Sequence, residues 1–195
     1  MGLLKNKWVG IGALAIIVIW AISTYNGMVT EEEKVNKAWG DVEAAYQRRM
    51  DLIPNLVNIV KGYATHEEKT LTEVVELRNK ATQMTISVDS LTEETMEQYQ
   101  KMQEQLSGSL SRLMAITEAY PELKANENFL QLQDQLEGTE NRINEVRKEY
   151  NATVQPYNVK VRKFPASLLS GIFGFSTKPM FKAQEGADKA VEVKF

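Results

Sequence analysis

The chain has 195 residues, with 23 basic and 26 acidic side chains and no cysteine. A net charge of −3 without a basic stripe does not favour nucleic-acid binding. The absence of cysteine excludes disulfides, thiolate zinc sites, cysteine nucleophiles and an N-terminal lipoprotein cysteine. Five prolines among many Glu, Gln, Lys, Leu and Met residues favour an all-α fold.

The first predicted element is a membrane-spanning helix over residues 8–25, a stretch without charge. It lies at the short end of the length that crosses a bilayer. Trp8, Trp20 and Tyr25 stand toward its ends, where interfacial aromatic residues are expected. A cleaved signal peptide is the alternative, with Ala21-Ile22-Ser23 as a small-x-small cleavage site. The long apolar run with bulky ends favours a retained single-pass anchor.

The charges around this span give only a small bias in orientation. Lys5 and Lys7 precede it, and Lys34 and Lys37 follow within the first turns after it. The positive-inside rule therefore supports the two orientations almost equally, and only the short N-terminal arm favours a cytoplasmic N-terminus. The side of the membrane that carries the body stays open.

A first long helix is expected after the anchor. Thr30 and Glu33 form a capping-box pattern that predicts its start. A helix nearly continuous with the anchor is the alternative, with Asn26-Gly27 as the favoured position for a break. Apolar residues then recur at steps of three and four, which places them on one face. This stripe comprises Val35, Trp39, Val42, Tyr46, Met50, Ile53, Val57, Val60 and Ala64.

The boundary between the first two helices decides how many helices the body has. Gly62, followed by a second capping-box pattern of Thr65 and Glu68, predicts a new and shorter helix. The sequence then predicts an antiparallel up-and-down four-helix bundle over residues 27–163, after an anchor at 1–26. If residues 30–83 formed one rod, the body would have three helices.

Two further helices follow a polar connection. Thr92 begins the third, and Pro121 ends it because the residue before a proline avoids the helical region. The fourth, over Asn126–Arg162, carries a heptad seam of the kind found in coiled coils, and Pro156 is expected to kink its end. The seam comprises Phe129, Leu132, Leu136, Thr139, Ile143, Val146, Tyr150, Thr153 and Tyr157.

The stretch Arg48–Val57 breaks the apolar pattern of the first helix with charges, an asparagine and Pro54. Polar groups near an apolar seam need partners, and three asparagines spaced by seven flank the seam of the fourth helix. We therefore predict a kink at Pro54 and a polar lock between the first and fourth helices, with a solvated asparagine flank as the alternative. The lock comprises Arg49, Asp51, Asn55, Asn144, Asn151 and Asn158.

The last part of the chain, 164–195, is expected to be an apolar loop and a tail. Its residues 164–175 carry no charge and are too few to span a bilayer. They either pack over one end of the bundle or touch the membrane or a neighbouring subunit. The residues predicted for such a contact are Leu168, Leu169, Ile172, Phe173 and Phe175. Lys178–Phe195 is expected to form a short helix and a tail.

The sequence offers no catalytic, cofactor or metal site. His66 is the only histidine, and Thr70 stands where a zinc-protease motif requires a second one, so helix capping or exposure is expected for His66. Gly10-x-Gly12 lies within the anchor and has no strand before it, which a phosphate-binding loop requires. Acidic pairs stand at predicted helix starts, where they complement the helix dipole.

The chain after the anchor closely resembles the LemA family. The segments that carry the resemblance are Asn36–Trp39, Arg48–Val57, Lys61–Glu67, Ala119–Lys124, Glu140–Ile143, Tyr150-Asn151, Tyr157-Asn158, Phe164-Pro165 and Phe173–Phe175. The resemblance implies an N-terminal membrane helix and a helical bundle of mirrored, bromodomain-like type. It also implies a bacterial membrane protein without an established enzymatic activity; one relative acts in magnetosome formation.

These observations predict a membrane-anchored scaffold or interaction protein of the bacterial envelope and no enzymatic activity. The location expected is the cell membrane, which is the inner membrane in a Gram-negative cell. The expected partners are the bilayer, through the N-terminal helix, and an unidentified protein or a second copy, but no nucleic acid. An oligomeric membrane-organising or membrane-remodelling protein is the alternative, and a hydrolase is a second one.

Overall fold

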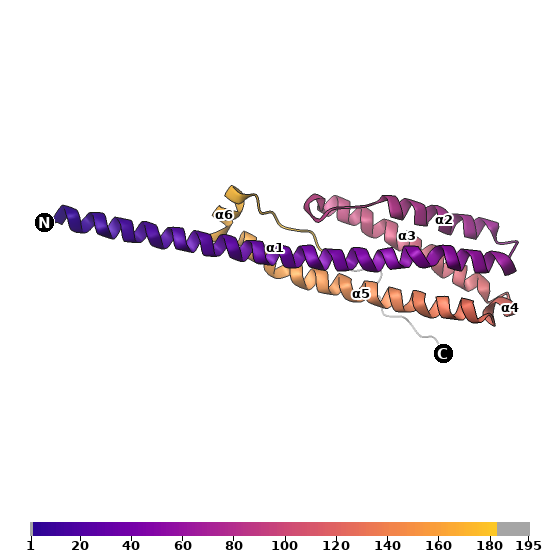
Figure 1. The fold of residues 1–195 in the computed structure, drawn as a ribbon. Coiled ribbons are helices and arrows are strands. Elements are labelled where there is room, and N and C mark those ends of the chain that lie inside the picture. The colour runs from indigo at the N-terminus through magenta and orange to yellow at the C-terminus, as the bar shows by residue number, and fades with distance from the viewer. Residues whose placement is uncertain (1, 183–195) are drawn as a thin grey trace, which may run out of the picture. The chain divides into compact units, whose positions relative to one another are not determined.

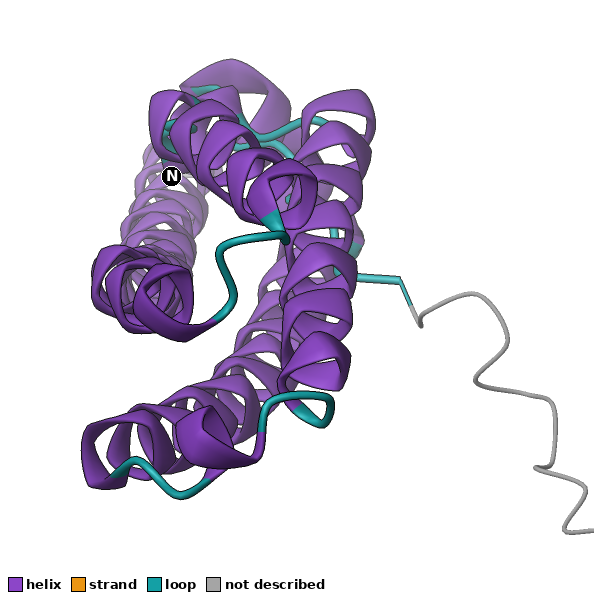
Figure 2. Ribbon diagram, turned by 90° about the vertical axis from the view of Figure 1, so that its right-hand side faces the viewer, coloured by secondary structure: helices purple, strands orange, loops and turns teal. Residues whose placement is uncertain are grey.

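The computed structural model describes residues 2–182, with side chains from Trp8 onward, and its regular elements in this range are all helical (Figures 1 and 2). This confirms the predicted all-α fold for the described part of the chain. The elements are α1 (Gly2–Tyr63), α2 (Glu68–Gln83), the 3₁₀ helix η1 (Val88–Ser90), α3 (Glu93–Thr117), α4 (Pro121–Lys124), α5 (Glu127–Arg162) and α6 (Ala166–Phe173).

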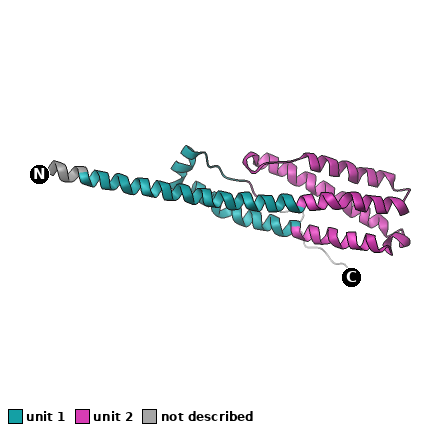
Figure 3. Cartoon of the chain, in the orientation of Figure 1, with its two compact units in different colours: residues 1–45, 143–178 teal, residues 46–142, 179–195 magenta. Residues whose placement is uncertain are grey.

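The contacts within the chain group it into two compact units (Figure 3). Unit 1 comprises residues 1–45 and 143–178, and unit 2 comprises residues 46–142 and 179–195. The helices α1 and α5 contribute residues to both units. The division into 1–26, 27–163 and 164–195 stays a prediction.

Unit 1 begins with the apolar part of α1. Its side chains over residues 8–20 are exposed, and α1 is, among the described residues, the one helix long and apolar enough to cross a membrane by length and composition. From Met28 onward the helix buries an apolar stripe instead. Trp39 of this stripe packs edge-to-face on Tyr150 of α5, with ring centroids 5.5 Å apart.

The helix start expected at Thr30 is wrong, and α1 does not break at Asn26-Gly27, because it runs through both positions. The alternative of a helix continuous with the charge-free stretch is the one that the structure has. Thr30 Oγ1 donates a hydrogen bond of 2.8 Å to the Asn26 carbonyl oxygen, so its hydroxyl serves the interior of a helix and caps nothing. Gly27 has a packing role: Lys160 Nζ donates to its carbonyl oxygen at 2.7 Å, in space that a side chain would fill.

Segments of α1, α2, α3 and α5 contribute to an apolar core in unit 2. Since α1 ends at Tyr63 and α2 begins at Glu68, the alternative of one rod over residues 30–83 is excluded. The capping box expected at Thr65 does not form. Glu67 occupies the N-cap position, but no side chain accepts a hydrogen bond from the first-turn amides of the helix. Thr65 lies two residues too early for its hydroxyl to do so.

The starts of α3 and α5 are confirmed. Thr92 Oγ1 accepts from the Thr95 amide at 3.1 Å, and Thr95 Oγ1 accepts from the Thr92 amide at 2.8 Å, which closes a reciprocal capping box. Asn126 Oδ1 accepts from the Phe129 amide at 3.0 Å at the start of α5. Pro121 follows the end of α3 and occupies the first turn of α4, where its missing amide costs nothing.

The seam predicted along α5 is buried as expected, with Leu132 and Thr153 half-buried. The apolar segment after it was expected to be a loop. That prediction is wrong for residues 166–173, which form α6. Gly174 ends this helix with φ 79°, a conformation that glycine adopts without the strain that a Cβ atom causes. Residues 178–182 are not helical, and the rest of the helix and tail expected after Lys178 lies outside the described residues.

Candidate functional site

Arg49 is the most unusual buried side chain of unit 2. It lies on the face of α1 that points into the unit, and only 1 % of it is exposed. A cation in such a position requires both a counter-charge and hydrogen-bond acceptors. Its surroundings therefore show what holds α1 in place.

Four residues from three helices form a polar group that we call the Arg49 cluster: Arg49, Gln103, Ser107 and Glu140. Arg49 Nη1 donates to Glu140 Oε1 at 2.8 Å and to Ser107 Oγ at 2.5 Å. Arg49 Nη2 donates to the side-chain oxygen of Gln103 and, at 3.3 Å, to its carbonyl oxygen. A single guanidinium thus joins α1 to α3 and α5.

Aromatic rings complete the surroundings of the guanidinium. Its carbon lies 5.1 Å from the centroid of the Tyr46 ring, within the range of a cation–π contact. Tyr46 in turn packs edge-to-face on Tyr99 of α3 at 5.4 Å. Ser107 Oγ also donates to Glu140 Oε2 at 3.4 Å, so hydroxyl and carboxylate are both held by the guanidinium, and the cluster fixes helices through an ion pair and its hydrogen bonds.

The three predicted lock residues of α1 differ in how deeply they are buried. Arg49 is buried, as a lock requires, and its ion pair with Glu140 does join α1 to α5. Asp51 and Asn55 are exposed, and Asp51 Oδ1 accepts from Gln47 Nε2 of the same helix at 2.7 Å. Asn55 lines a shallow hollow with other amide side chains, among them Gln131 of α5.

The three asparagines of the predicted lock belong to unit 1. Asn144 is exposed, while Asn151 and Asn158 are half-buried. Asn158 makes two hydrogen bonds with the backbone of Lys178: its Nδ2 donates to the carbonyl oxygen and its Oδ1 accepts from the amide, both at 2.8 Å. It thereby fastens the segment after α6 to α5. The pairing of these asparagines with Arg49 or Asp51 stays a prediction.

A second polar group lies in unit 1, around Glu32 of α1. The Tyr157 hydroxyl donates to Glu32 Oε1 at 3.3 Å, and the buried ammonium of Lys178 lies 3.7 Å from the same oxygen. Burial raises the pKa of Tyr157 well above its usual range, and the neighbouring Glu32 carboxylate raises that pKa further. The neutral phenol of Tyr157 and the ion pair between Lys178 and Glu32 together fix the segment after α6 to α1 and α5.

Pro54 leaves a carbonyl group of α1 without its usual partner. A proline has no amide hydrogen, so the carbonyl oxygen of Met50, one turn earlier, loses its helical hydrogen bond. Arg78 of α2 donates to this oxygen from its Nε at 3.3 Å. The proline thus provides an acceptor through which α2 contacts α1. The kink at Pro54 stays a prediction.

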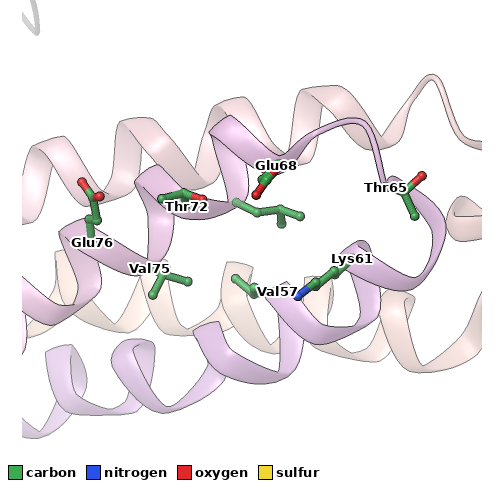
Figure 4. A pocket seen from close by; sticks show the side chains of 8 residues that line it. Val57, Lys61, Thr65, Glu68, Thr72, Val75 and Glu76 are labelled. Atoms are coloured by element: carbon green, nitrogen blue, oxygen red, sulfur yellow. The ribbon is translucent and has the colours of Figure 1, made fainter.

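A groove of about 450 Å³ lies between the end of α1 and α2 (Figure 4). Val57, Leu71 and Val75 provide its apolar part, and Lys61 and Glu68 stand on its rim. The remaining lining residues are Thr65, Thr72 and Glu76. These side chains suit contact with an apolar group better than acid–base or nucleophilic chemistry.

The other candidates from the sequence are placed as follows. His66 is exposed in the turn between α1 and α2. Among the described residues, no three His, Asp or Glu side chains gather closely enough to hold a metal ion. Within and beside α6, three of the residues predicted for membrane or partner contact are exposed and two are half-buried. The exposed ones are Leu168, Ile172 and Phe173, and the half-buried ones are Leu169 and Phe175.

Sequence reasoning did not assign Gln103, Ser107 or Glu140 to the site. They lie 54, 58 and 91 positions from Arg49, so no local pattern connects them. One signal was present: Gln103 interrupts the apolar spacing of α3 one turn before Leu106, at a position that the fold buries. Buried glutamine requires a polar partner, and the arginine in the stripe of α1 was the natural one.

Comparisons with known proteins support the resemblance. Residues 38–195 match the family model of the LemA family. Magnetosome protein MamQ 2 of Paramagnetospirillum magneticum is 26% identical over 200 residues, which cover 93% of this chain and 74% of the relative. Magnetosome protein MamQ of Magnetospirillum gryphiswaldense is 25% identical, covering 92% and 72%. Protein LemA of Metamycoplasma hominis is 22% identical, covering 82% and 69%. The chain belongs to the LemA family.

Proposed function

We propose that this protein is a single-pass, membrane-anchored scaffold of the bacterial envelope. The first part of α1 spans the bilayer, and an antiparallel four-helix bundle presents a helical face to a protein partner. The continuity of α1 carries this proposal: the apolar stretch over residues 8–25 passes into the buried stripe that starts at Met28 within one helix.

The exposed apolar surface of α1 supports the spanning role. Ile16 and Ile19 are 69% and 67% exposed, and their large apolar neighbours along residues 8–20 are exposed as well. Removing one such side chain from water stabilises a protein by about 1.5–3 kcal/mol. A bilayer provides that burial for the whole stretch at once.

A scaffold needs no reactive group. Its contribution is confinement: a bundle held at the bilayer meets partners in the same membrane at a raised effective concentration. Modest contacts then suffice for assembly. Relatives named magnetosome proteins support a membrane-associated role.

Cross-linking in intact membranes followed by mass spectrometry tests the scaffold role. We expect reproducible cross-links from lysines of α2, α3 and α5 to one or a few other proteins, or to a second copy. The matched control is an Ile16→Arg, Ile19→Arg variant, which should lose these links because the anchor fails. Links that are absent from the wild type, or equally strong in the control, would contradict a membrane-confined scaffold.

An oligomeric, membrane-organising protein is the second candidate. The observation in its favour is the apolar side that α6 turns outward, with Leu168 and Ile172 at 61% and 74% exposure. The size of the detergent-solubilised protein and the shape of vesicles that contain it separate the two candidates. A discrete oligomer on deformed vesicles supports this one, and a monomer in undistorted vesicles excludes it.

A further inference from the structure

The helix α6 exposes large apolar side chains on its outward side, unlike a helix on a protein surrounded by water. Its inward side carries Ser170, which is buried and donates from Oγ to the Val161 carbonyl oxygen of α5 at 3.0 Å. Its outward side carries Leu168 and Ile172, and Phe164 just before the helix is 75% exposed. Water selects the opposite arrangement, with polar residues outside.

The position of α6 along α1 indicates what covers this outward side. Tyr25, which closes the charge-free stretch, packs edge-to-face on Phe173 and Phe175, with ring centroids 4.9 and 5.6 Å apart. Contact with Tyr25 places α6 beside α1 at the C-terminal end of the apolar stretch (Figure 1). If the stretch spans a bilayer, α6 lies at the level of its headgroups.

The charges around α6 agree with a lipid surface. Between Glu149 and Glu185 the chain has no acidic residue, and the exposed Arg162 and Lys163 lie a few residues before α6. The nearest acidic run of α1 begins at Glu31, six residues beyond Tyr25, or about 9 Å farther along the helix. The surface beside α6 is therefore basic, as required for anionic lipid headgroups.

We propose that α6 is an interfacial helix that lies on the same bilayer that α1 spans. Leu168, Ile172 and the neighbouring Phe164 enter the boundary between headgroups and acyl chains, and Arg162 and Lys163 contact anionic headgroups. This inference rests on the proposed function, since it takes the first part of α1 as the span. It adds a second attachment that fixes the protein at one depth.

A bilayer fits this surface better than a second copy of the chain. The exposed apolar side chains of the α6 region are Phe164, Leu168, Ile172 and Phe173. Four partly exposed side chains of this size offer roughly half of the about 800 Å² that each partner contributes to a stable protein interface. Confinement in one membrane lowers this requirement for a second copy as well, but two copies of the same basic surface repel each other, whereas anionic headgroups attract it.

Single-cysteine spin labels test the proposal on the full-length protein, whose natural sequence contains no cysteine. Nitroxides are attached at Ile172→Cys in α6, Ile19→Cys in the span and Gln133→Cys on the exposed side of α5. The protein is reconstituted into phosphatidylcholine vesicles with and without phosphatidylglycerol. Collision with oxygen reports lipid exposure, and collision with a water-soluble nickel complex reports water exposure.

The ratio of oxygen accessibility to nickel accessibility should be highest for the Ile19 label, intermediate for the Ile172 label and lowest for the Gln133 label. Phosphatidylglycerol should shift the Ile172 label toward oxygen, and an Arg162→Gln, Lys163→Gln background should lose that shift. Both basic side chains are exposed, so this background should leave the fold intact.

Three outcomes would overturn the inference, and they are distinguishable. An Ile172 label as accessible to nickel as the Gln133 label refutes the interfacial helix, while an oxygen-exposed Ile19 label leaves the anchor standing. An Ile19 label that behaves like Gln133 removes the proposed function and the inference with it. Spin–spin broadening at Ile172 that disappears on dilution with unlabelled protein assigns the surface to a second copy.

Discussion

At the residue scale, one buried cation fixes three helices. Arg49 breaks the apolar pattern of α1, and that break was visible in the sequence because a charge stood within a helical stripe. Its partners were not predictable, since Gln103 and Glu140 come close only when the helices pack. Partner identity at this distance in sequence is a property of tertiary structure.

The two ends of the ion pair have unequal exposure, and this predicts unequal effects of their removal. Arg49 is 1% exposed, whereas Glu140 is 36% exposed and stays hydrated without its partner. Glu140→Ala should destabilise the protein by about 3–5 kcal/mol, because it leaves a cation buried without a counter-charge. Arg49→Met should cost about 1–3 kcal/mol. Denaturant unfolding in detergent, followed by circular dichroism, measures both.

A double variant and a neighbouring glutamate provide the controls. Arg49→Met combined with Glu140→Ala should be more stable than Glu140→Ala alone, because no buried charge is left. Glu137→Ala, one turn earlier on the exposed side of α5, should change stability by less than about 0.5 kcal/mol. A double variant that is less stable than either single variant would contradict this explanation.

Two buried tyrosines predict how stability depends on pH. Burial raises the pKa of Tyr150 and Tyr157, so the folded state favours the neutral phenol. This contribution is fully present below the usual tyrosine pKa of about 10 and is lost as the pH rises above it. We expect the free energy of unfolding to fall above about pH 10, and less steeply after Tyr150→Phe and Tyr157→Phe. An unchanged slope in the double variant would refute the assignment.

At the element scale, the sequence predicted where α3 and α5 begin, and both helices start after a loop. Thr92 and Asn126 cap α3 and α5, and the heptad seam of α5 is buried. The same chemistry failed at Thr30, because a threonine inside a helix satisfies its hydroxyl on a carbonyl oxygen one turn back. A capping pattern therefore predicts a start only where the preceding chain is not already helical.

The helix α6 was missed for a related reason. Its eight residues are too few for a periodic pattern, and Gly171 within them indicated a loop. The helix forms because it packs on α1 and α5, through Phe173 on Tyr25 and Ser170 on Val161. Tertiary contacts, which the sequence does not display, stabilise short helices of this kind.

The contact between Pro54 and Arg78 predicts a measurable coupling between α1 and α2. In the wild type, Arg78 donates to the Met50 oxygen that Pro54 leaves without an amide partner. Arg78→Met should therefore cost about 1 kcal/mol. In a Pro54→Ala background the new amide takes this oxygen, so the same substitution should cost much less. A double-mutant cycle on the free energy of unfolding measures the difference.

Lys80 on the exposed side of α2 provides the matched control. Lys80→Met should cost the same small amount in the wild type and in the Pro54→Ala background, since Lys80 does not contact α1 through that oxygen. Equal costs of Arg78→Met in both backgrounds would show that the proline and the arginine act independently. Pro54 would then have no part in joining the two helices.

At the scale of the whole molecule, we propose that α1 attaches a helical body to a membrane. The sequence indicated this through the charge-free stretch over residues 8–25, and the structure continues that stretch into the buried stripe without a linker. Membership of the LemA family agrees with this organisation. Family membership by itself identifies no partner.

An alkaline carbonate wash of cell membranes tests the claim most directly. We predict that the full-length protein stays in the membrane pellet, as integral proteins do. Ile16→Arg with Ile19→Arg should move it to the supernatant, because each central arginine costs about 2.5–3.5 kcal/mol of insertion free energy. Release of the wild-type protein into the supernatant, whether intact or shortened after Ser23, would contradict the membrane anchor.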